Sequence, residues 1–243
     1  MDVDSRIETL CKVLCLTHIP RFVNTHEFDT KETWLLSLLE SELECREETK
    51  KLRLYKQAKF PIKKELASYE WHEHISLPNE TTKQELTSLS FIDRCENVVL
   101  VGTPGTGKTH LALALGVLAT SHSVPTKFWR VSDLMGKLSK HWANGTLKAF
   151  KKSLDSIKLI ILDEMGYIPF TKEGAELLFE FVSDWYETKS VIITSNLEFS
   201  AWSKVFVDAR LTAALVDRLI HHAHIIRFTG ESYRLKNALS SSR

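Results

Sequence analysis

The feature that most constrains this chain is a glycine-rich loop between an apolar run and a helix-favouring run. The apolar residues 98–101 lead into Gly102-Thr-Pro-Gly-Thr-Gly-Lys-Thr109, which fits the pattern G-x-x-x-x-G-K-[ST], and residues 110–115 follow with helical character. A glycine-rich loop with this pattern, placed between a strand and a helix, is a phosphate loop. In such a loop, backbone amides and the helix N-terminus bind phosphate oxygens. Such a loop predicts an α/β fold with a parallel sheet.

The residue types in this loop predict that it binds a nucleoside triphosphate together with Mg²⁺. Lys108 is expected to reach the β- and γ-phosphates, and the hydroxyl group of Thr109 is expected to ligate Mg²⁺. The glycines let the loop curl tightly around the phosphates. The predicted nucleotide-binding residues are Gly102, Thr103, Pro104, Gly105, Thr106, Gly107, Lys108, Thr109 and His110.

A second apolar run, residues 158–162, ends in two adjacent carboxylates, Asp163 and Glu164. In open α/β sheets, ligands bind at the carboxyl ends of the strands. Asp163 is expected to hold Mg²⁺, directly or through water, and Glu164 to orient and polarise the attacking water as a general base. The pair favours hydrolysis over small-molecule kinase chemistry, because a kinase must keep water away from the γ-phosphate.

Three further polar residues are candidates for completing the site. The apolar run 191–193 ends in Thr-Ser-Asn196, and Asn196 is expected to share the lytic water with Glu164 and to sense the γ-phosphate, although an Asn after a strand is usually a turn residue. Arg218 and Arg234 are candidates for the cation that stabilises the transition state. Spacing alone favours an ordinary surface charge for each arginine.

The hydrophobic pattern changes along the chain and predicts two domains. From residue 97 onward, short apolar runs alternate with amphipathic runs, which is typical of a parallel sheet between helices. We expect a small all-helical domain over residues 1–75, with a capping box at Asp29 and Glu32, and an α/β domain over residues 76–243. The expected strands are 97–101, 126–131, 158–162, 190–194 and 224–228, and the expected helices of the α/β domain are 108–121, 132–144, 173–187 and 211–222.

Charge is concentrated in the predicted helical domain. Residues 46–64 contain eight basic and two acidic residues, so this segment carries +6 and the rest of the chain −5, which gives the net charge of +1. Arg46, Lys50 and Arg53 recur at helical spacing and share a face, which suits contacts to DNA phosphates. A solvated helix face explains the charge alone equally well. The predicted DNA-binding residues are Arg46, Lys50, Arg53, Lys56 and Lys59.

Composition excludes several other classes of protein. Apolar residues make up 43% and charged residues 26% of the chain, which is typical of a soluble globular protein. No stretch approaches the roughly 18 consecutive apolar residues of a membrane span, and the polar N-terminus lacks the layout of a secretory signal. The four cysteines are sparse and unevenly spaced, which favours reduced, packed thiols and a cytoplasmic location.

Seven segments, in sequence order, resemble the IstB-like transposition helper ATPases, the insertion-sequence partners of DDE transposases and relatives of the DnaC helicase loaders. These segments are GTPGTGKTHLA, LIILDEMGYIPF, GAELLFEFV, ITSN, SAWSKVF, ALVDRLIHHA and GESYRL, and the similarity covers about residues 45 to 236. The resemblance implies a AAA+ fold of the initiator clade, ATP-dependent homo-oligomers on duplex DNA, and delivery of target DNA to a transposase.

The resemblance also implies roles for single residues. Arg218 matches the arginine finger that reaches into the next protomer, and Arg234 matches a sensor 2-like arginine. Trp185 departs from the family pattern, which commonly has arginine there. The chain ends soon after its last expected strand, so we expect no C-terminal helical lid and closure of the site by a neighbouring subunit. The other matches are Lys108 and Thr109 to Walker A, Asp163 and Glu164 to Walker B, and Asn196 to sensor 1.

The expected activity is therefore DNA-stimulated hydrolysis of ATP to ADP and phosphate at subunit interfaces. A DnaC-like helicase loader of DNA replication is the alternative, with the same ATPase motifs and a replicative helicase as its partner. A small-molecule kinase would need an acceptor pocket and a lid over the phosphates. A protein-binding adaptor would use ATP as a structural ligand, without turnover.

Overall fold

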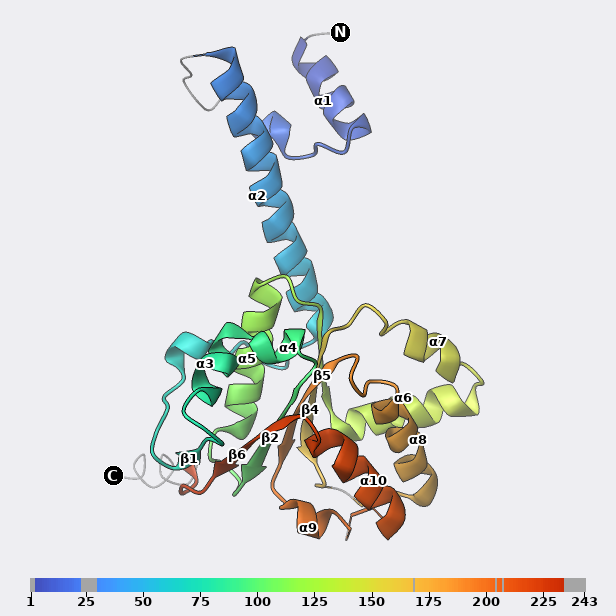
Figure 1. Ribbon diagram of the computed structural model, residues 1–243. Coiled ribbons are helices and arrows are strands. Elements are labelled where there is room, and N and C mark those ends of the chain that lie inside the picture. The colour runs from blue at the N-terminus through green and yellow to red at the C-terminus, as the bar shows by residue number, and fades with distance from the viewer. Residues whose placement is uncertain (1–2, 23–29, 168, 204, 207, 234–243) are drawn as a thin grey trace, which may run out of the picture. The chain divides into compact units, whose positions relative to one another are not determined.

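The computed structural model describes residues 3–22, 30–167, 169–203, 205–206 and 208–233 (Figure 1). The chain divides into two compact units, Met1–Arg53 and Leu54–Arg243, and the division falls within helix α2 (Lys31–Ala58). The domain boundary expected from composition lies near residue 75 instead. Residues 54–75 pack with the second unit, because Tyr69 and Ile75 are buried in its core.

The first unit is helical, as the sequence predicts, and has a small core. Helix α1 (Val3–Val13), the 3₁₀ turn η1 (Ile19–Arg21) and the first part of α2 bury Cys11, Ile19 and Leu38. The capping box expected at Asp29 falls on a residue outside the described ranges.

At the N-terminal end of α2, Thr30 and Thr33 form a reciprocal cap. The amide of Thr33 donates to Oγ1 of Thr30 over 3.2 Å, and the amide of Thr30 donates to Oγ1 of Thr33 over 3.3 Å. Together these bonds satisfy two backbone donors that the first turn of a helix leaves without partners.

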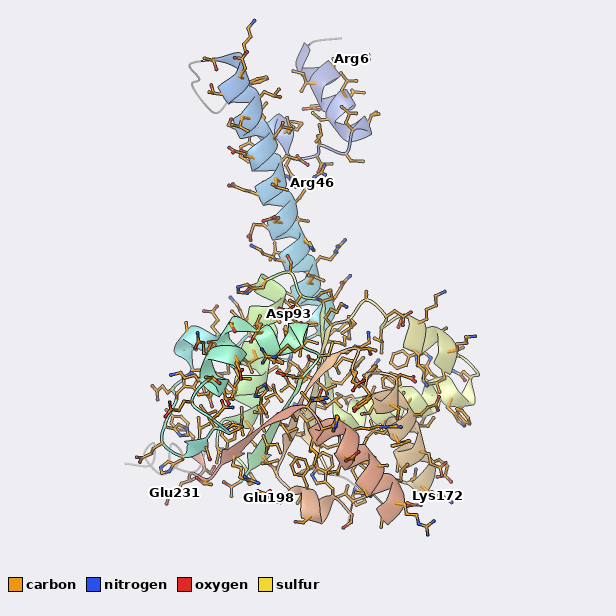
Figure 2. The ribbon with its side chains drawn as sticks, viewed as in Figure 1. Arg6, Arg46, Asp93, Lys172, Glu198 and Glu231 are labelled. Atoms are coloured by element: carbon orange, nitrogen blue, oxygen red, sulfur yellow. The ribbon has the colours of Figure 1, made fainter. Side chains whose placement is uncertain are left out.

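A buried carboxylate holds the turn after α1 onto α2. Glu42 is 3% exposed and accepts hydrogen bonds from the amides of His18 (2.7 Å) and Ile19 (3.0 Å) and from Nε of Arg46 (2.7 Å). Burial by itself would raise the pKa of Glu42, but the bonds from Arg46 and the two amides outweigh burial and lower it. Arg46, labelled on α2 in Figure 2, also donates to the carbonyl of Cys15, so this predicted DNA contact has a structural role in its own unit.

The second unit is built on a six-stranded sheet in the order β1-β6-β2-β5-β4-β3. The five strands from β6 to β3 are parallel, whereas β1 pairs antiparallel with β6. All five expected strands are present, with ends shifted by no more than three residues. The strands are β1 (Ile75–Ser76), β2 (Asn97–Gly102), β3 (Thr126–Arg130), β4 (Leu159–Met165), β5 (Ser190–Ser195) and β6 (Ala223–Phe228).

Helices cover both faces of this sheet (Figure 1). Alternate residues of β2 point to opposite faces, so Val98 and Leu100 pack against one layer and Val99 and Val101 against the other. The first layer contains α3 (Thr82–Ser88), α4 (Ser90–Asp93) and α5 (Lys108–Ser121), and the second contains α6 (Val131–Ala143), α8 (Lys172–Ser183) and α10 (Ala209–Ile220).

The four helices expected in the α/β domain form close to their predicted ranges, and α5 matches its range at both ends. Helix α8 ends at Ser183, four residues early, because the chain turns there and Glu187 adopts a φ of 57°. Among the described residues of the second unit, the elements that the sequence patterns missed are too short for a periodic pattern: β1, η2 (Leu66–Ser68), α3, α4, α7 (Leu147–Lys152) and α9 (Phe199–Trp202). Within the described part of the chain, no helix is both long and apolar enough to cross a membrane.

Replacing Glu42 by alanine is expected to loosen the turn after α1. The amides of His18 and Ile19 lose their acceptor, and an unsatisfied buried donor costs about 1–3 kcal/mol. Hydrogen–deuterium exchange at pH 7 should therefore be faster at these two amides. The Glu44→Ala variant, which changes an exposed carboxylate on the same helix, is the matched control.

The pH dependence of this difference follows from the direction of the pKa shift. Because folding lowers the pKa of Glu42 from 4.5, its stabilisation is fully present above that pH and is lost as the pH falls through the folded-state value. The difference in amide protection between the wild type and Glu42→Ala should therefore shrink as the pH falls. Equal exchange rates in the two proteins at pH 7 would contradict this role of Glu42.

Candidate active site

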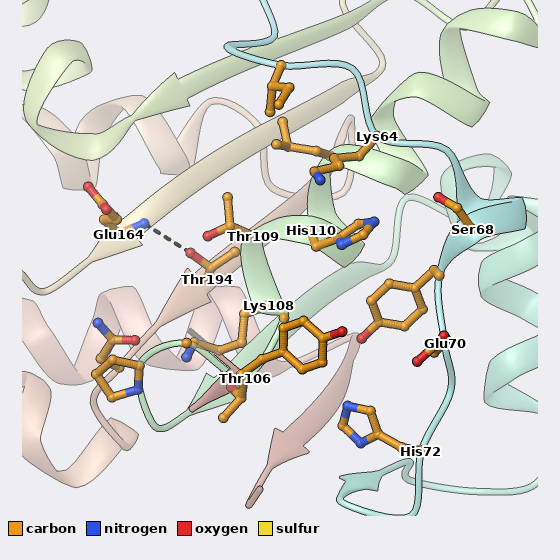
Figure 3. Close-up of a pocket in the computed structure, with 18 residues that line it drawn as sticks. Lys64, Ser68, Glu70, His72, Thr106, Lys108, Thr109, His110, Glu164 and Thr194 are labelled. Atoms are coloured by element: carbon orange, nitrogen blue, oxygen red, sulfur yellow. Dashed lines mark hydrogen bonds between the residues drawn. The ribbon is translucent and has the colours of Figure 1, made fainter. Parts of the chain in front are cut away.

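A pocket of about 560 Å³ lies where β2, β4 and β5 end, next to the glycine-rich loop (Figure 3). One wall consists of loop residues 104–107 and the first residues of α5. A second wall carries polar residues at or just after the ends of β4 and β5, and a third comes from residues within the segment 62–72. Of the sequence-predicted residues, the lining includes Pro104, Gly105, Thr106, Gly107, Lys108, Thr109, His110, Glu164 and Asn196.

The backbone of the loop requires glycine where it meets the sheet and the helix. A Cβ atom on Gly102 would lie 2.0 Å from the carbonyl oxygen of Phe228 in β6, so β6 packs directly against the start of the loop. Gly107 precedes α5 with a φ of 98°, a conformation that side chains disfavour. These two positions fix the path of the loop between β2 and the N-terminus of α5.

Lys108 begins α5 and places its ammonium group inside the loop. The residue is 5% exposed, and its Nζ donates to the carbonyl oxygens of Gly102 (2.8 Å) and Thr103 (2.7 Å). The loop thus surrounds a positive charge beside the N-terminal end of a 14-residue helix. Both features attract an anion, and a phosphate group is the anion that such a loop fits.

Asp163 joins two strands and a helix through its carboxylate. It is 3% exposed, and its Oδ1 accepts hydrogen bonds from Oγ1 of Thr109 (2.8 Å) and Oγ1 of Thr194 (2.6 Å). A carboxylate and a hydroxyl group beside a phosphate loop are the oxygen ligands that Mg²⁺ prefers, usually together with water and phosphate oxygens. The donor set therefore fits this ion.

Glu164 differs from Asp163 in exposure and backbone conformation. It has a φ of 64° and is exposed, so its side chain lines the pocket while the preceding carboxylate is buried. Its amide donates to Oγ1 of Thr194 over 3.0 Å (Figure 3). Asn196 lines the same pocket and is also exposed. This arrangement places a carboxylate and an amide where water reaches them.

Thr194 is a residue that the sequence analysis did not select. Its single hydroxyl group donates to Asp163 and accepts from the amide of Glu164, so it sets the relative positions of both carboxylate-bearing residues. The available signal was its place two residues before Asn196, at the end of an apolar strand. Threonine is common in strands, and the pattern there indicated only a strand.

The segment 62–72 was also missed, because it was assigned to the helical domain. Tyr69 is 9% exposed, and its ring packs edge-on against His110, with the centroids 5.3 Å apart. Neither Oη of Tyr69 nor Nε2 of His110 has a hydrogen-bond partner among the described residues. Burial raises the pKa of Tyr69, and burial with the nearby charge of Lys64 lowers that of His110, so both groups are neutral at pH 7.

The two candidate arginines lie apart from these groups or outside the described residues. Arg218 is half-buried in α10, where its guanidinium group lies 4.5 Å from the ring centroid of Phe179 and donates to Oγ of Ser183. It does not line the pocket. Arg234 lies outside the described residues, but the amide of Tyr233 donates to the carbonyl of Gly105 over 3.0 Å, so the chain passes the loop immediately before it.

Trp185 and the predicted DNA contacts lie elsewhere. Trp185 is 4% exposed and packs edge-on against Phe181, so an apolar core residue occupies the position where the family pattern has arginine. The predicted DNA contacts other than Arg46 are exposed, and none forms a salt bridge with a described residue. They are Lys50, Arg53, Lys56 and Lys59.

Comparison with known proteins identifies relatives along most of the chain. The family model of IstB-like ATP binding proteins matches residues 22–241. The chain is 34% identical over 219 residues to a protein of Bacillus thuringiensis named as an ATP-binding protein of insertion sequence IS232, covering 90% of this chain and 87% of the relative. It is 39% identical over 181 residues to the corresponding protein of IS21 from Pseudomonas aeruginosa, covering 74% of this chain and 68% of the relative.

Solved structures share the fold of the second unit. AMPPCP-bound DnaA from Aquifex aeolicus superposes with a TM-score of 0.55 at 19% identity, over 73% of this chain and 55% of that chain. The DnaC helicase loader superposes with a TM-score of 0.53 at 22% identity, over 74% of this chain and 99% of that chain. These similarities confirm the predicted α/β fold of AAA+ P-loop proteins. The helices expected at the N-terminus are α1 and α2.

Replacing Thr194 by valine is expected to reduce ATP hydrolysis about 10- to 100-fold, the usual effect of removing a group that orients a metal ligand. Valine keeps the shape of the side chain but removes the bonds to Asp163 and to the amide of Glu164. Phosphate release at saturating ATP measures the effect, and Thr194→Ser, which keeps the hydroxyl group, is the control. Wild-type turnover in Thr194→Val would show that this hydroxyl group does not position the carboxylates.

Proposed function

The chain belongs to the family of IstB-like ATP binding proteins, and we propose that it is a DNA-stimulated ATPase that assists transposition. The observation that carries the proposal is the bonding of Asp163 to Thr109 and Thr194 beside the phosphate loop, with Glu164 exposed next to it. A buried carboxylate for a metal ion, adjacent to a solvent-accessible carboxylate for water, is the combination that hydrolysis of a triphosphate requires.

Each residue of the pocket has a proposed role in this reaction. Lys108 neutralises charge on the β- and γ-phosphates, and Thr109 and Asp163 would hold Mg²⁺. The ion, when bound, supplies positive charge to the phosphate oxygens. Glu164 accepts the proton of the attacking water, and Asn196 holds the same water in line with the γ-phosphate.

The wall formed by residues 62–72 is proposed to bind the nucleoside. Tyr69 and His110 offer neutral polar groups without partners on an aromatic surface. A purine nucleoside supplies both a flat apolar face and hydrogen-bonding atoms, and it therefore satisfies these groups while the phosphates occupy the loop.

Arg218 is proposed to act on the nucleotide of a neighbouring protomer. Arg218 lies on α10, packs against Phe179 and Ser183 of α8, and does not line the pocket of its own chain, which supports a role at the pocket of a second copy. An arginine at this point stabilises charge on the γ-phosphoryl group in the transition state. ATP would in this way stabilise an oligomer, and hydrolysis would release it.

DNA binding is proposed to occur through the exposed cations of α2 and the residue after it. Contacts from lysine and arginine to phosphates give affinity without base specificity and weaken with salt. Several weak contacts add up when protomers assemble along one duplex. The names of the relatives, which refer to insertion sequences, favour a transposase as the partner over the replicative helicase of a loader.

Glu164→Gln is expected to bind ATP with unchanged affinity, to hydrolyse it at least 100-fold more slowly, and to stay assembled on duplex DNA. Glutamine keeps the shape of the side chain but does not accept the proton. A fluorescent ATP analogue measures binding, and phosphate release measures turnover. Lys108→Ala, which removes the charge in the loop, is the matched variant and should lose nucleotide binding. If Glu164→Gln hydrolysed ATP at the wild-type rate, Glu164 would not be the general base.

Mixing two inactive variants tests whether Arg218 acts between protomers. Arg218→Ala retains its own loop, and Lys108→Ala retains its own arginine, so a mixed assembly contains some interfaces with both groups intact. We expect each variant alone to be inactive and an equal mixture to recover part of the wild-type ATPase rate. No recovery in mixtures that co-assemble on DNA would place the action of Arg218 within its own chain.

A further inference from the structure

A second depression, of about 1090 Å³, lies along the edge strand β3 and shares no lining residue with the nucleotide pocket. We call it the β3 groove. Residues from the end of α2, from β3 and from α6 converge on it. Five cations line it, against the single carboxylate of Asp133: Lys59, Lys127, Arg130, Lys137 and Lys140.

The positive charge of the β3 groove is not neutralised within the described residues. None of the five cations forms a salt bridge there, and neither does Asp133. Burial, together with the charges of Lys59 and Lys137, lowers the pKa of Lys127. The charges of Lys59 and Lys137 therefore each repel that of Lys127, and a bound polyanion would offset this repulsion.

The structure holds parts of the groove in fixed positions. Nζ of Lys127 donates to the carbonyl of Gln57 near the end of α2 over 2.7 Å and lies 5.8 Å from the ring centroid of Trp129. Lys137 and Lys140 are three residues apart on α6 and share a face of that helix. The cations therefore form a preorganised surface rather than a set of independent side chains.

The lining of the groove shows what kind of anion it suits. Phe128 and Trp129 are 6% and 5% exposed, while Phe150 and Ile157 are half-buried and Pro61 is exposed. Five cations from separate segments of the chain face one carboxylate, and this spread of positive charge matches a repeating phosphate backbone. An acidic peptide, which adds apolar anchors to its charge, is the alternative ligand that the test distinguishes.

We propose that the β3 groove binds the phosphate backbone of nucleic acid, as a DNA contact on the ATPase unit additional to those predicted on α2. The inference rests on the proposed DNA-stimulated function and adds residues that the sequence analysis did not select: Lys127, Arg130, Lys137 and Lys140. It also offers a route for stimulation, because Arg130 at the end of β3 pairs in register with Asp163 of β4. DNA in the groove thus lies one strand away from the proposed Mg²⁺ ligand.

The test measures binding of the full chain, with Mg²⁺ and a slowly hydrolysed ATP analogue, to a fluorescein-labelled duplex over a series of KCl concentrations. In the variant Lys137→Gln/Lys140→Gln, we expect weaker binding at every concentration. The slope of log affinity against log salt should fall by about 1.8, because each lost phosphate contact accounts for about 0.9. Both side chains are exposed, and binding of a fluorescent ATP analogue should be unchanged.

The matched control is Lys83→Gln/Lys172→Gln, which removes the same charge from two exposed positions outside the groove. Lys83 lies on α3, and Lys172, labelled in Figure 2, lies on α8. Its affinity and slope should equal those of the wild type. If the control weakens binding as much as the groove variant does, the effect is one of net charge and the proposal is overturned. The proposal is also overturned if the groove variant loses affinity for polyglutamate but not for the duplex, since an acidic protein is then the ligand.

A third variant separates this inference from the proposed function. Lys50→Gln/Arg53→Gln removes predicted contacts on α2 and leaves the β3 groove intact. If this variant loses affinity while the groove variant binds like the wild type, DNA binding stands and the groove is not part of it. If the wild type binds no duplex under any of these conditions, the proposed function and the groove fail together.

Discussion

The hydroxyl groups of Thr109 and Thr194, both bonded to Asp163, connect the glycine-rich loop to the carboxyl ends of β4 and β5. A buried carboxylate is costly unless hydrogen bonds replace its water, and here Thr109 and Thr194 provide them. Because these residues belong to α5 and β5, the bonds fix the glycine-rich loop against two strands. The exposed Glu164 takes its position from the same network through its amide. The geometry of the pocket therefore depends on the burial of one charge.

Much of the second unit could be predicted because its strands are buried on both faces. Such strands read as continuous apolar runs, and the runs placed five strands nearly where they lie. The division between units could not be read in the same way. Residues 62–75 look like a polar continuation of the helical region, yet Tyr69 and Ile75 are buried against the sheet. Burial of that kind depends on tertiary contacts, which composition does not record.

The site shows the same contrast between local patterns and tertiary contacts. Lys108 and Thr109 were found through the glycine-rich pattern, and Asp163, Glu164 and Asn196 because each lies at or just after the end of an apolar strand. Parallel strands bring such ends together. Thr194 and Tyr69 lie in segments whose local pattern indicates only a strand or a connector. Arg218 packs against Phe179 and Ser183 of its own chain and does not line the pocket there. Its proposed role at a triphosphate depends on contact between two copies of the chain, which a sequence pattern does not describe.

The ammonium group of Lys108 already has carbonyl partners in the loop, at Gly102 and Thr103. An entering anion must therefore compete with two oxygen atoms for the same donor. A polyphosphate carries several negative charges and attracts this ammonium group more strongly than a singly charged anion such as chloride does. The loop therefore favours polyanions through charge alone, before any base or sugar makes contact.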